Sequence, residues 1–344
     1  MNPSRRDLTL LLTAAPWLFT SHVSPALAQS RRGSEARQPQ KPDGKGRAPT
    51  GITQIVEFLA SPFPYSGRAP GRETPFLDTT KDGRRGRLAP RGGFTPDNAY
   101  TDKRVLLHLG AGFDAQRPAA LIVFLHGQRS QLTRDLRNRQ HIPAQFDASG
   151  LNGALVAPQL AFDAIDSAAG RFWEPGFFND FLNEAASRLG ELSRDGGAVF
   201  RSMPIILVAY GSGAEAAAYA LQIGGAASRI HGVILLDAWL DERARFVTWL
   251  VTKRNDAFLL SAYGPAARAD NAALRKELAA HGLTGRDGRP SVLSPGSLWF
   301  VDAGSADHRD FMTKAWTVDP LKVLLSQIPE FRRQTLNTSS RGDR

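Results

Sequence analysis

Short runs of consecutive apolar residues recur along the middle of the chain. They lack the polar alternation of a half-exposed strand, so they predict strands that are buried on both faces of a parallel sheet. The runs occupy residues 105–109, 121–125, 154–157, 205–209, 233–236, 258–260 and 298–301.

Between these runs the apolar residues return every three or four positions, as in amphipathic helices. Residues 177–192 show this period, and residues 214–223 are rich in alanine and end at two glycines, a helix stop signal. Further helices are predicted over 270–280 and about 319–328. Strands alternating with helices predict an α/β fold with a doubly wound, mostly parallel sheet and helices on both faces.

The first 28 residues read as an export signal. Arg5 and Arg6 precede an apolar run at 8–19, and residues 26–28 offer the small side chains that a signal peptidase reads. The run of about 12 residues is too short to span a bilayer, which needs about 20. We therefore expect a periplasmic or secreted protein with no stable membrane insertion after cleavage. The arginine pair resembles a twin-arginine signal without its usual lysine, and the ordinary secretory route stays open.

The remaining chain divides by composition. Residues 29–50 contain no bulky apolar side chain and predict a disordered linker. Residues 332–344 predict a basic flexible tail, which leaves a single domain over 51–331.

Composition narrows the classes of function. The 344 residues carry a formal net charge of +10, but residues 1–50 hold eight Lys or Arg against three Asp or Glu, and the predicted domain is close to neutral. A near-neutral domain lacks the basic footprint of a nucleic-acid reader. Cysteine is absent, which excludes disulfides, thiolate metal sites and a cysteine nucleophile.

Chemically useful residues follow several predicted strands. His126, Gly127 and Gln128 come after one strand, Ser212 after another, and Asp237 after the next. Ligands of such sheets bind at the carboxyl ends of the strands, so these side chains are candidates for one site.

With His308 after the last strand, the chain has a serine, an acid and a histidine in the order of the α/β-hydrolase superfamily, which residues 100–328 resemble. The resemblance implies Ser212 as nucleophile, Asp237 as the acid that orients the histidine, and His308 as general base. It also implies a small-molecule ester or amide substrate, an acyl-enzyme, and no cofactor or metal. Backbone amides of Gln128 and Gly213 would form the oxyanion hole.

Residues 124–145, 155–176, 221–238 and 260–278 further resemble a group of exported bacterial α/β-hydrolase-like proteins without a firm substrate. That resemblance supports the fold more than the activity.

The position of the nucleophile stays open between two residues. A nucleophile elbow needs small residues two positions before and after its tip. Ala209 and Gly213 suit a tip at Gly211, whereas a tip at Ser212 has bulky Tyr210 two positions before it. The resembled bacterial proteins carry Tyr-Ser-Gly-Gly here. The chain is therefore either a serine hydrolase working through Ser212 or a catalytically inactive binding protein with Gly211 at the tip.

The other site residues also have alternatives. Asp302 is a rival acid, and Asp237 could instead cap the following helix. His308 could be an ordinary loop histidine. Asp302, Asp307, His308 and Asp310 match no metal-binding motif. The side chain of His126 is expected to be structural, and the arginines between 129 and 139 are expected on a solvated helix face rather than on a substrate carboxylate.

Overall fold

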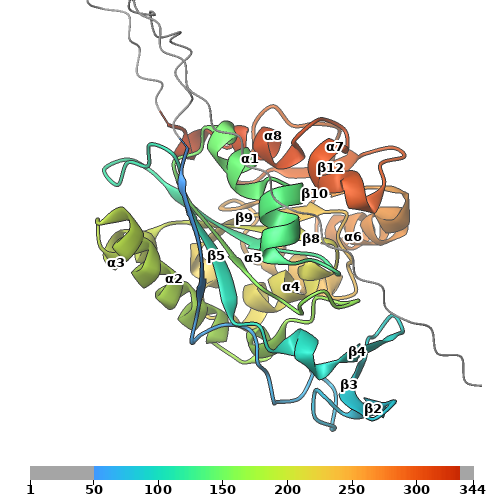
Figure 1. Cartoon of the computed structure of the whole chain (residues 1–344). Helices are drawn as coiled ribbons and strands as arrows, with labels where there is room; N and C mark the ends of the chain where they lie inside the picture. The colour runs from blue at the N-terminus through green and yellow to red at the C-terminus, as the bar shows by residue number, and fades with distance from the viewer. Residues whose placement is uncertain (1–49, 334–344) are drawn as a thin grey trace, which may run out of the picture. The chain divides into compact units, whose positions relative to one another are not determined.

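The computed structural model describes residues 50–333, and a nine-stranded sheet lies at the centre of this region (Figure 1). Its strands are β1 (Ile52–Glu57), β5 (Arg104–Leu109), β6 (Ala120–Leu125), β7 (Gly153–Pro158), β8 (Ile205–Tyr210), β9 (Ile230–Leu236), β10 (Phe258–Tyr263), β11 (Arg286–Asp287) and β12 (Leu298–Asp302). They are ordered β1-β5-β7-β6-β8-β9-β10-β12-β11. Strand β5 is antiparallel to both neighbours, β1 and β7, and every other pair is parallel.

All seven strands predicted from apolar runs are present, because both faces of the sheet are covered. Alternate residues of one strand enter two separate hydrophobic cores. In β8, Ile205 and Leu207 pack into one core, and Ile206 and Val208 into the other. A strand between two cores needs an apolar residue at every position, which is the pattern that the sequence shows.

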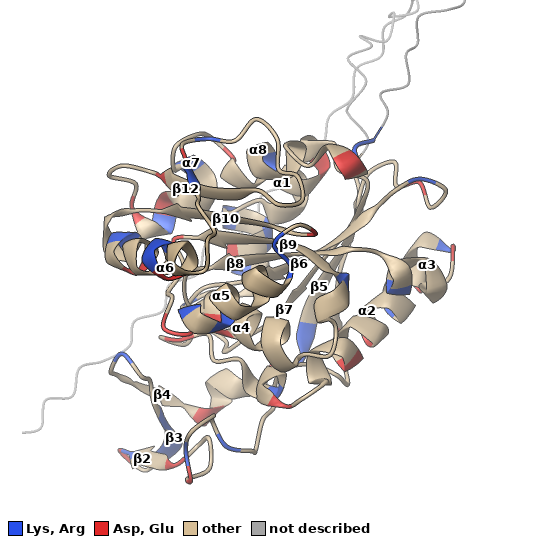
Figure 2. Cartoon of the chain, turned by 180° about the vertical axis from the view of Figure 1, so that it is seen from behind, with Lys and Arg blue, Asp and Glu red and all other residues tan. Residues whose placement is uncertain are grey.

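Helices lie on both sides of the sheet (Figure 1). One side carries α2 (Phe177–Ser193), α3 (Gly197–Ser202), α4 (Ala214–Ile223), α5 (Arg243–Thr252) and α6 (Arg268–Ala280). The other side carries α1 (Ile142–Ser149), α7 (Phe311–Lys314) and α8 (Pro320–Ser326). The predicted α/β class, with a doubly wound, mostly parallel sheet and helices on both faces, is confirmed. Residues of both signs of charge occur on these helices (Figure 2).

A small antiparallel sheet was not predicted. It consists of β2 (Thr79–Lys81), β3 (Arg84–Leu88) and β4 (Phe94–Pro96), and it lies apart from the central sheet in Figure 1. The connection from β3 to β4 turns through Gly92 and Gly93, both with φ near +90°. This turn carries Arg91, which reaches the site described below.

The predicted segments at the two ends of the chain lie mostly outside the described residues. The export signal (1–28) and the linker (29–50, apart from Thr50) lie outside the described residues. At the other end, Arg332 forms a bridge with Leu151, and the Arg333 amide donates to the Gly150 carbonyl at 2.8 Å. The described fold thus continues past the predicted end at 331. Within 50–333, no helix combines the length and apolarity needed to cross a membrane.

Candidate functional site

The turn between β8 and α4 decides which residue faces the histidine. Gly211 begins this turn with φ +54°, a left-handed conformation that glycine adopts without strain. A Cβ placed on Gly211 would lie 3.1 Å from His308 Nε2 and 2.8 Å from Gln128 Oε1. A nucleophile elbow holds its reactive side chain at such a strained tip, directed at the histidine. In the observed turn Gly211 is therefore the residue directed at His308, and it carries no side chain there.

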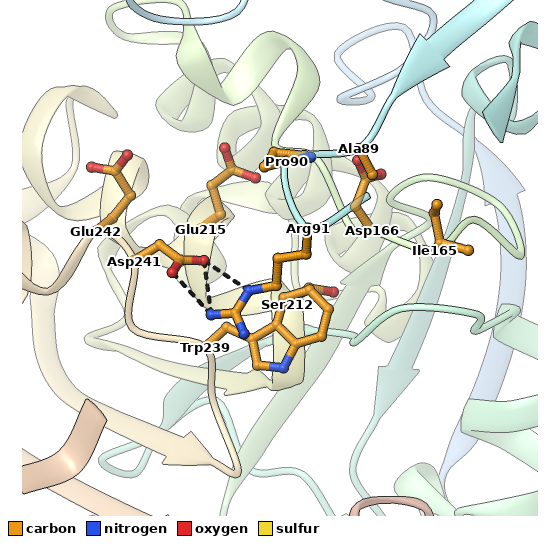
Figure 3. A pocket seen from close by; sticks show the side chains of 10 residues that line it. All are labelled: Ala89, Pro90, Arg91, Ile165, Asp166, Ser212, Glu215, Trp239, Asp241 and Glu242. Atoms are coloured by element: carbon orange, nitrogen blue, oxygen red, sulfur yellow. Dashed lines mark hydrogen bonds and ion pairs between the residues drawn. The ribbon is translucent and has the colours of Figure 1, made fainter. Parts of the chain in front are cut away.

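Ser212 lies one residue beyond that tip. Its side chain lines a small pocket of about 170 Å³ together with Trp239 and Glu215 (Figure 3). The residue is 5% exposed, and its Oγ has no hydrogen-bond partner among residues 50–333. The predicted hydrogen bond from Ser212 to His308 is therefore wrong. The physical reason is that the turn does not shift: the glycine, rather than the serine, takes the left-handed conformation.

Asp237 and His308 are in contact as predicted. His308 Nδ1 lies 2.7 Å from Asp237 Oδ2, and the Gly264 amide donates to Asp237 Oδ1 at 2.8 Å. Asp237 follows β9 and is only 3% exposed. The rival acid, Asp302, forms an exposed ion pair with Arg268 at 3.3 Å instead. Of the two candidate acids, Asp237 is the one that orients the imidazole.

The side chain of Gln128 joins the histidine to the turn. Its Nε2 lies 3.1 Å from His308 Nε2, and its Oε1 accepts from the Ser212 amide at 3.3 Å. Because His308 Nδ1–H donates to Asp237, Nε2 carries the lone pair and accepts from Gln128. The sequence predicted backbone amides of Gln128 and Gly213 as oxyanion donors. In the observed turn the amide after the tip belongs to Ser212, and a side chain of the protein itself occupies it.

Tyr210 fixes the His308 loop. Its ring stacks on the imidazole with 4.6 Å between centroids and 12° between planes, and its hydroxyl donates to the His308 carbonyl at 2.5 Å. Burial raises the pKa of Tyr210, so the hydroxyl stays protonated as a donor. A Cβ on Gly127 would lie 3.0 Å from the Tyr210 carbonyl oxygen, so a glycine here permits the close approach.

His126 has a structural position. It is fully buried, and its Nε2 accepts from the Leu160 amide at 2.9 Å. Burial lowers the pKa of His126 to about 4, which keeps the ring neutral and able to accept. This position agrees with the structural role expected for its side chain.

His308 faces a cavity of its own. We call it the His308 hollow, with a volume of about 710 Å³. Its lining residues are Gln128, Arg129, Ser130, Arg134, Asp135, Arg139, Asp163, Tyr210, Asp307, His308 and Arg309. Arg129, Arg134 and Arg139 are exposed, as expected of a solvated face, and they also line this open hollow, where Arg134 and Arg139 form ion pairs with the buried Asp135.

The cavity that contains Ser212 has a different lining, and we call it the Ser212 pocket. Its lining residues are Ala89, Pro90, Arg91, Ile165, Asp166, Ser212, Glu215, Trp239, Asp241 and Glu242. None of them lines the His308 hollow, so the serine and the histidine of the predicted triad face different cavities.

Sequence reasoning missed the carboxylates of the Ser212 pocket. Burial raises the pKa of Glu215 to about 8, and burial likewise raises the pKa of Asp166. One signal for Glu215 was present in the sequence: it is a single charge within the alanine-rich stretch that became α4. In the part of the chain that the structure describes, no three His, Asp or Glu side chains are grouped to hold a metal ion.

Comparisons with known proteins concern the fold. No protein-family model matches the chain, and no curated protein does. Among solved structures, the chain is similar to a feruloyl esterase module from Clostridium thermocellum in complex with sinapinate, with 14% identity and a TM-score of 0.46 over 79% of this chain and 99% of that one.

Two further similar structures are also esterases. A ferulic acid esterase from the anaerobic fungus Anaeromyces mucronatus shows 12% identity and a TM-score of 0.40 over 84% of this chain and 92% of that one. A butyrate-bound esterase from Thermogutta terrifontis shows 13% identity and a TM-score of 0.36, over 60% and 80%. Likeness at this level says nothing about substrate or about the roles of single residues.

Proposed function

We propose that this chain is a non-acylating protein of the α/β-hydrolase fold, which binds a small molecule at the carboxyl edge of its sheet. The observation that carries the proposal is Gly211 at the turn tip, with its missing side chain directed at His308 Nε2. An acyl-enzyme needs a hydroxyl within hydrogen-bond reach of the base. Glycine offers none at this position.

The surroundings of His308 support the same conclusion. Gln128 caps the imidazole lone pair and also occupies the Ser212 amide, the two groups that would otherwise act on a substrate. The nearest serine hydroxyl along the chain lines another cavity. Base, amide donor and hydroxyl are thus present without the alignment that acyl transfer requires.

Covalent labelling tests the proposal. A fluorophosphonate probe reacts with serine nucleophiles that a general base activates, so the folded domain is expected to remain unlabelled under conditions that label a serine esterase fully. A probe adduct mapped to Ser212 would overturn the proposal and restore the triad of Ser212, Asp237 and His308.

A second candidate function rests on the intact dyad. Asp237 Oδ2 lies 2.7 Å from His308 Nδ1, and His308 lines the His308 hollow, an arrangement suited to a general base acting on water. Ester hydrolysis by this route requires the Gln128 side chain to rotate away. It predicts turnover of p-nitrophenyl acetate without a burst, lost in His308→Ala and retained in Ser212→Ala. Absence of wild-type turnover would exclude this candidate.

We also propose export to the periplasm or medium, from the arginine pair and short apolar run at the start of the sequence. Amino-terminal sequencing of the protein from its native fractions tests this point. A start near Gln29 supports export, and a full-length cytoplasmic form as the main species contradicts it.

A further inference from the structure

The Ser212 pocket gathers negative charge from three parts of the chain. Its carboxylates are Asp166, Glu215, Asp241 and Glu242. Three of them have an arginine partner, but Glu215 forms no ion pair with any residue between 50 and 333. Figure 3 shows Glu215 and Glu242 on the same side of the pocket as Asp241. A carboxylate that has no cation partner within its pocket can form a new charge-assisted hydrogen bond with a cationic ligand.

Two further polar atoms in the pocket lack partners. Ser212 Oγ and Asp166 Oδ2 are both without hydrogen bonds in the described chain, and their residues are 5% and 6% exposed. Arg87 lies 3.6 Å from that Asp166 oxygen, beyond hydrogen-bond distance. Buried polar atoms without partners are rare in proteins and call for a ligand or water. Both atoms accept hydrogen bonds, so a ligand with N–H donors would satisfy them.

The protein itself already places a guanidinium at the mouth of the pocket. Arg91 donates to both oxygens of Asp241 at 2.9–3.2 Å, and its guanidinium carbon lies 4.4 Å from the centre of the Trp239 ring. Figure 3 shows this side chain passing across the pocket. The Arg91 side chain is 46% exposed and projects from the glycine turn between β3 and β4. Such a group can be displaced, since an exposed ion pair contributes little.

The Ser212 pocket has space for the head group of a ligand. Its volume of about 170 Å³ is below the roughly 300 Å³ at which drug-sized pockets begin, and Ala89, Pro90, Glu215 and Glu242 also line an adjoining cavity of about 390 Å³. Pro90 and Ile165 give the wall an apolar part. The space suits a charged head group on a short alkyl chain.

We propose that the Ser212 pocket binds a small organic cation, a guanidinium or primary ammonium on a short alkyl chain, with the charge at Glu215 and Arg91 as a displaceable plug. This inference rests on the proposed function, because it names the ligand class of a binding protein. Ser212 contributes its hydroxyl as a hydrogen-bond acceptor rather than as a nucleophile.

The electrostatics of Glu215 agree with this geometry. Burial and the nearby Asp166 and Glu242, against the opposing effects of Arg87 and Trp173, together raise the pKa of Glu215 to about 8. Arg91 and Asp241, which form an ion pair with each other, are the other charged groups that line the same pocket. A bound cation favours the ionised carboxylate, so binding releases a proton below about pH 8. The affinity for a permanently charged guanidinium is therefore expected to rise between pH 6 and pH 9.

Calorimetric titration of the folded domain with n-butylguanidinium at pH 8.5 tests the proposal. We expect binding of n-butylguanidinium and n-butylammonium, and none of butyrate or n-butanol at the same concentration. Equal binding of butanol would show an apolar site without charge recognition and would overturn the proposal. So would the absence of binding by both cations.

Two matched pairs of variants locate the ligand. Glu215→Gln is expected to weaken butylguanidinium binding about tenfold or more, whereas Glu191→Gln on the exposed face of α2 leaves it unchanged. Arg91→Ala is expected to strengthen binding about fivefold or more, whereas Arg84→Ala on β3 does not. Unchanged affinity in both Glu215→Gln and Arg91→Ala would overturn the assignment of the site.

The same samples separate this inference from the proposed function. A fluorophosphonate adduct on Ser212 contradicts the non-acylating function, whatever the cations do. A protein that takes up no label and binds neither cation agrees with the non-acylating function and contradicts the proposed cation site. If Glu215→Gln fails to unfold cooperatively, the pH dependence of affinity in the wild-type domain replaces it, and a flat profile from pH 6 to 9 counts against Glu215.

Discussion

Tyr210 lines the His308 hollow, and Ser212, two residues later, lines the Ser212 pocket. One short turn thus separates two cavities of different character. The hollow has about 710 Å³ and four arginines, and the pocket has about 170 Å³ and four carboxylates. The difference teaches that adjacency in sequence does not bring two side chains into one site, because the residues on either side of Gly211 line two cavities that share no residue.

The variant with the largest expected effect adds a hydroxyl group next to His308. The double variant Gly211→Ser with Gln128→Ala places a serine side chain at the tip and removes the amide that a new Cβ would meet at 2.8 Å. We expect fluorophosphonate labelling at position 211 and hydrolysis of p-nitrophenyl acetate at least about a hundredfold above the Gln128→Ala protein.

The control for that variant is Gly211→Ala with Gln128→Ala, which adds the Cβ without the hydroxyl. It is expected to stay unlabelled and inactive. A cooperatively folded serine variant that takes up no label would show that Gly211 does not occupy the nucleophile position.

A second variant removes the carboxylate that orients His308. Asp237→Asn removes the negative charge that accepts from His308 Nδ1 at 2.7 Å in a buried position. We expect a loss of about 1–3 kcal/mol in the free energy of unfolding, measured in urea. Asp302→Asn, at the exposed rival acid, should change it by less than about 0.5 kcal/mol. Equal losses would mean that the dyad does not stabilise the fold.

The ionisation of Glu215 in the Ser212 pocket should be visible in the pH dependence of the thermal unfolding temperature. The pKa of Glu215 is raised to about 8 in the folded protein, so between its ordinary value of 4.5 and about 8 the folded state binds more protons than the unfolded state. Its contribution to stability is therefore present at low pH and is lost as pH rises through that window. Thermal unfolding of Glu215→Gln should fall less from pH 5 to pH 8 than wild type, by a few degrees.

Glu191→Gln serves as the control for that measurement and should follow the wild-type curve. If Glu215→Gln also follows it, the carboxyl of Glu215 is ionised in the folded protein at neutral pH.

The smallest expected effect is on the free energy of unfolding when two buried serines are each replaced by alanine. Ser212 Oγ has no partner in the described chain, so Ser212→Ala should leave the free energy of unfolding unchanged or raise it by up to about 1 kcal/mol. Ser261 Oγ donates to Asn271 Oδ1 at 2.6 Å, so Ser261→Ala should lower it by about 1–2 kcal/mol. Urea unfolding measures both. A clear loss in Ser212→Ala would reveal a partner for its hydroxyl.

The sequence predicted the central fold well, because strands between two cores must be apolar throughout, as 205–209 are. It failed for β2 to β4, where residues 79–96 are polar and rich in glycine and arginine, without an apolar period. Because these strands were not predicted, the place of Arg91 in the Ser212 pocket was not predicted either. The pairing of Asp237 with His308 followed from their places after two strands, which meet at one edge of the sheet.

The turn itself could not be read from composition. Tyr-Gly-Ser-Gly offers glycine at two positions, and either can adopt a left-handed conformation. The choice depends on what surrounds the tip: the Gly211 carbonyl accepts from the Trp239 amide at 3.0 Å, and Gln128 fills the space beside it. These contacts join residues far apart in sequence, which a local pattern does not contain.

The contacts around His308 have a consequence for the free energy of ligand binding. Tyr210 stacks on its ring, Asp237 holds one nitrogen and Gln128 the other, so three separate parts of the chain restrain one side chain before any ligand arrives. Ordering a free side chain on binding costs about 0.5–1.5 kcal/mol of conformational entropy. At His308 that loss has already occurred during folding, and a ligand entering the hollow meets an imidazole whose orientation it does not need to select.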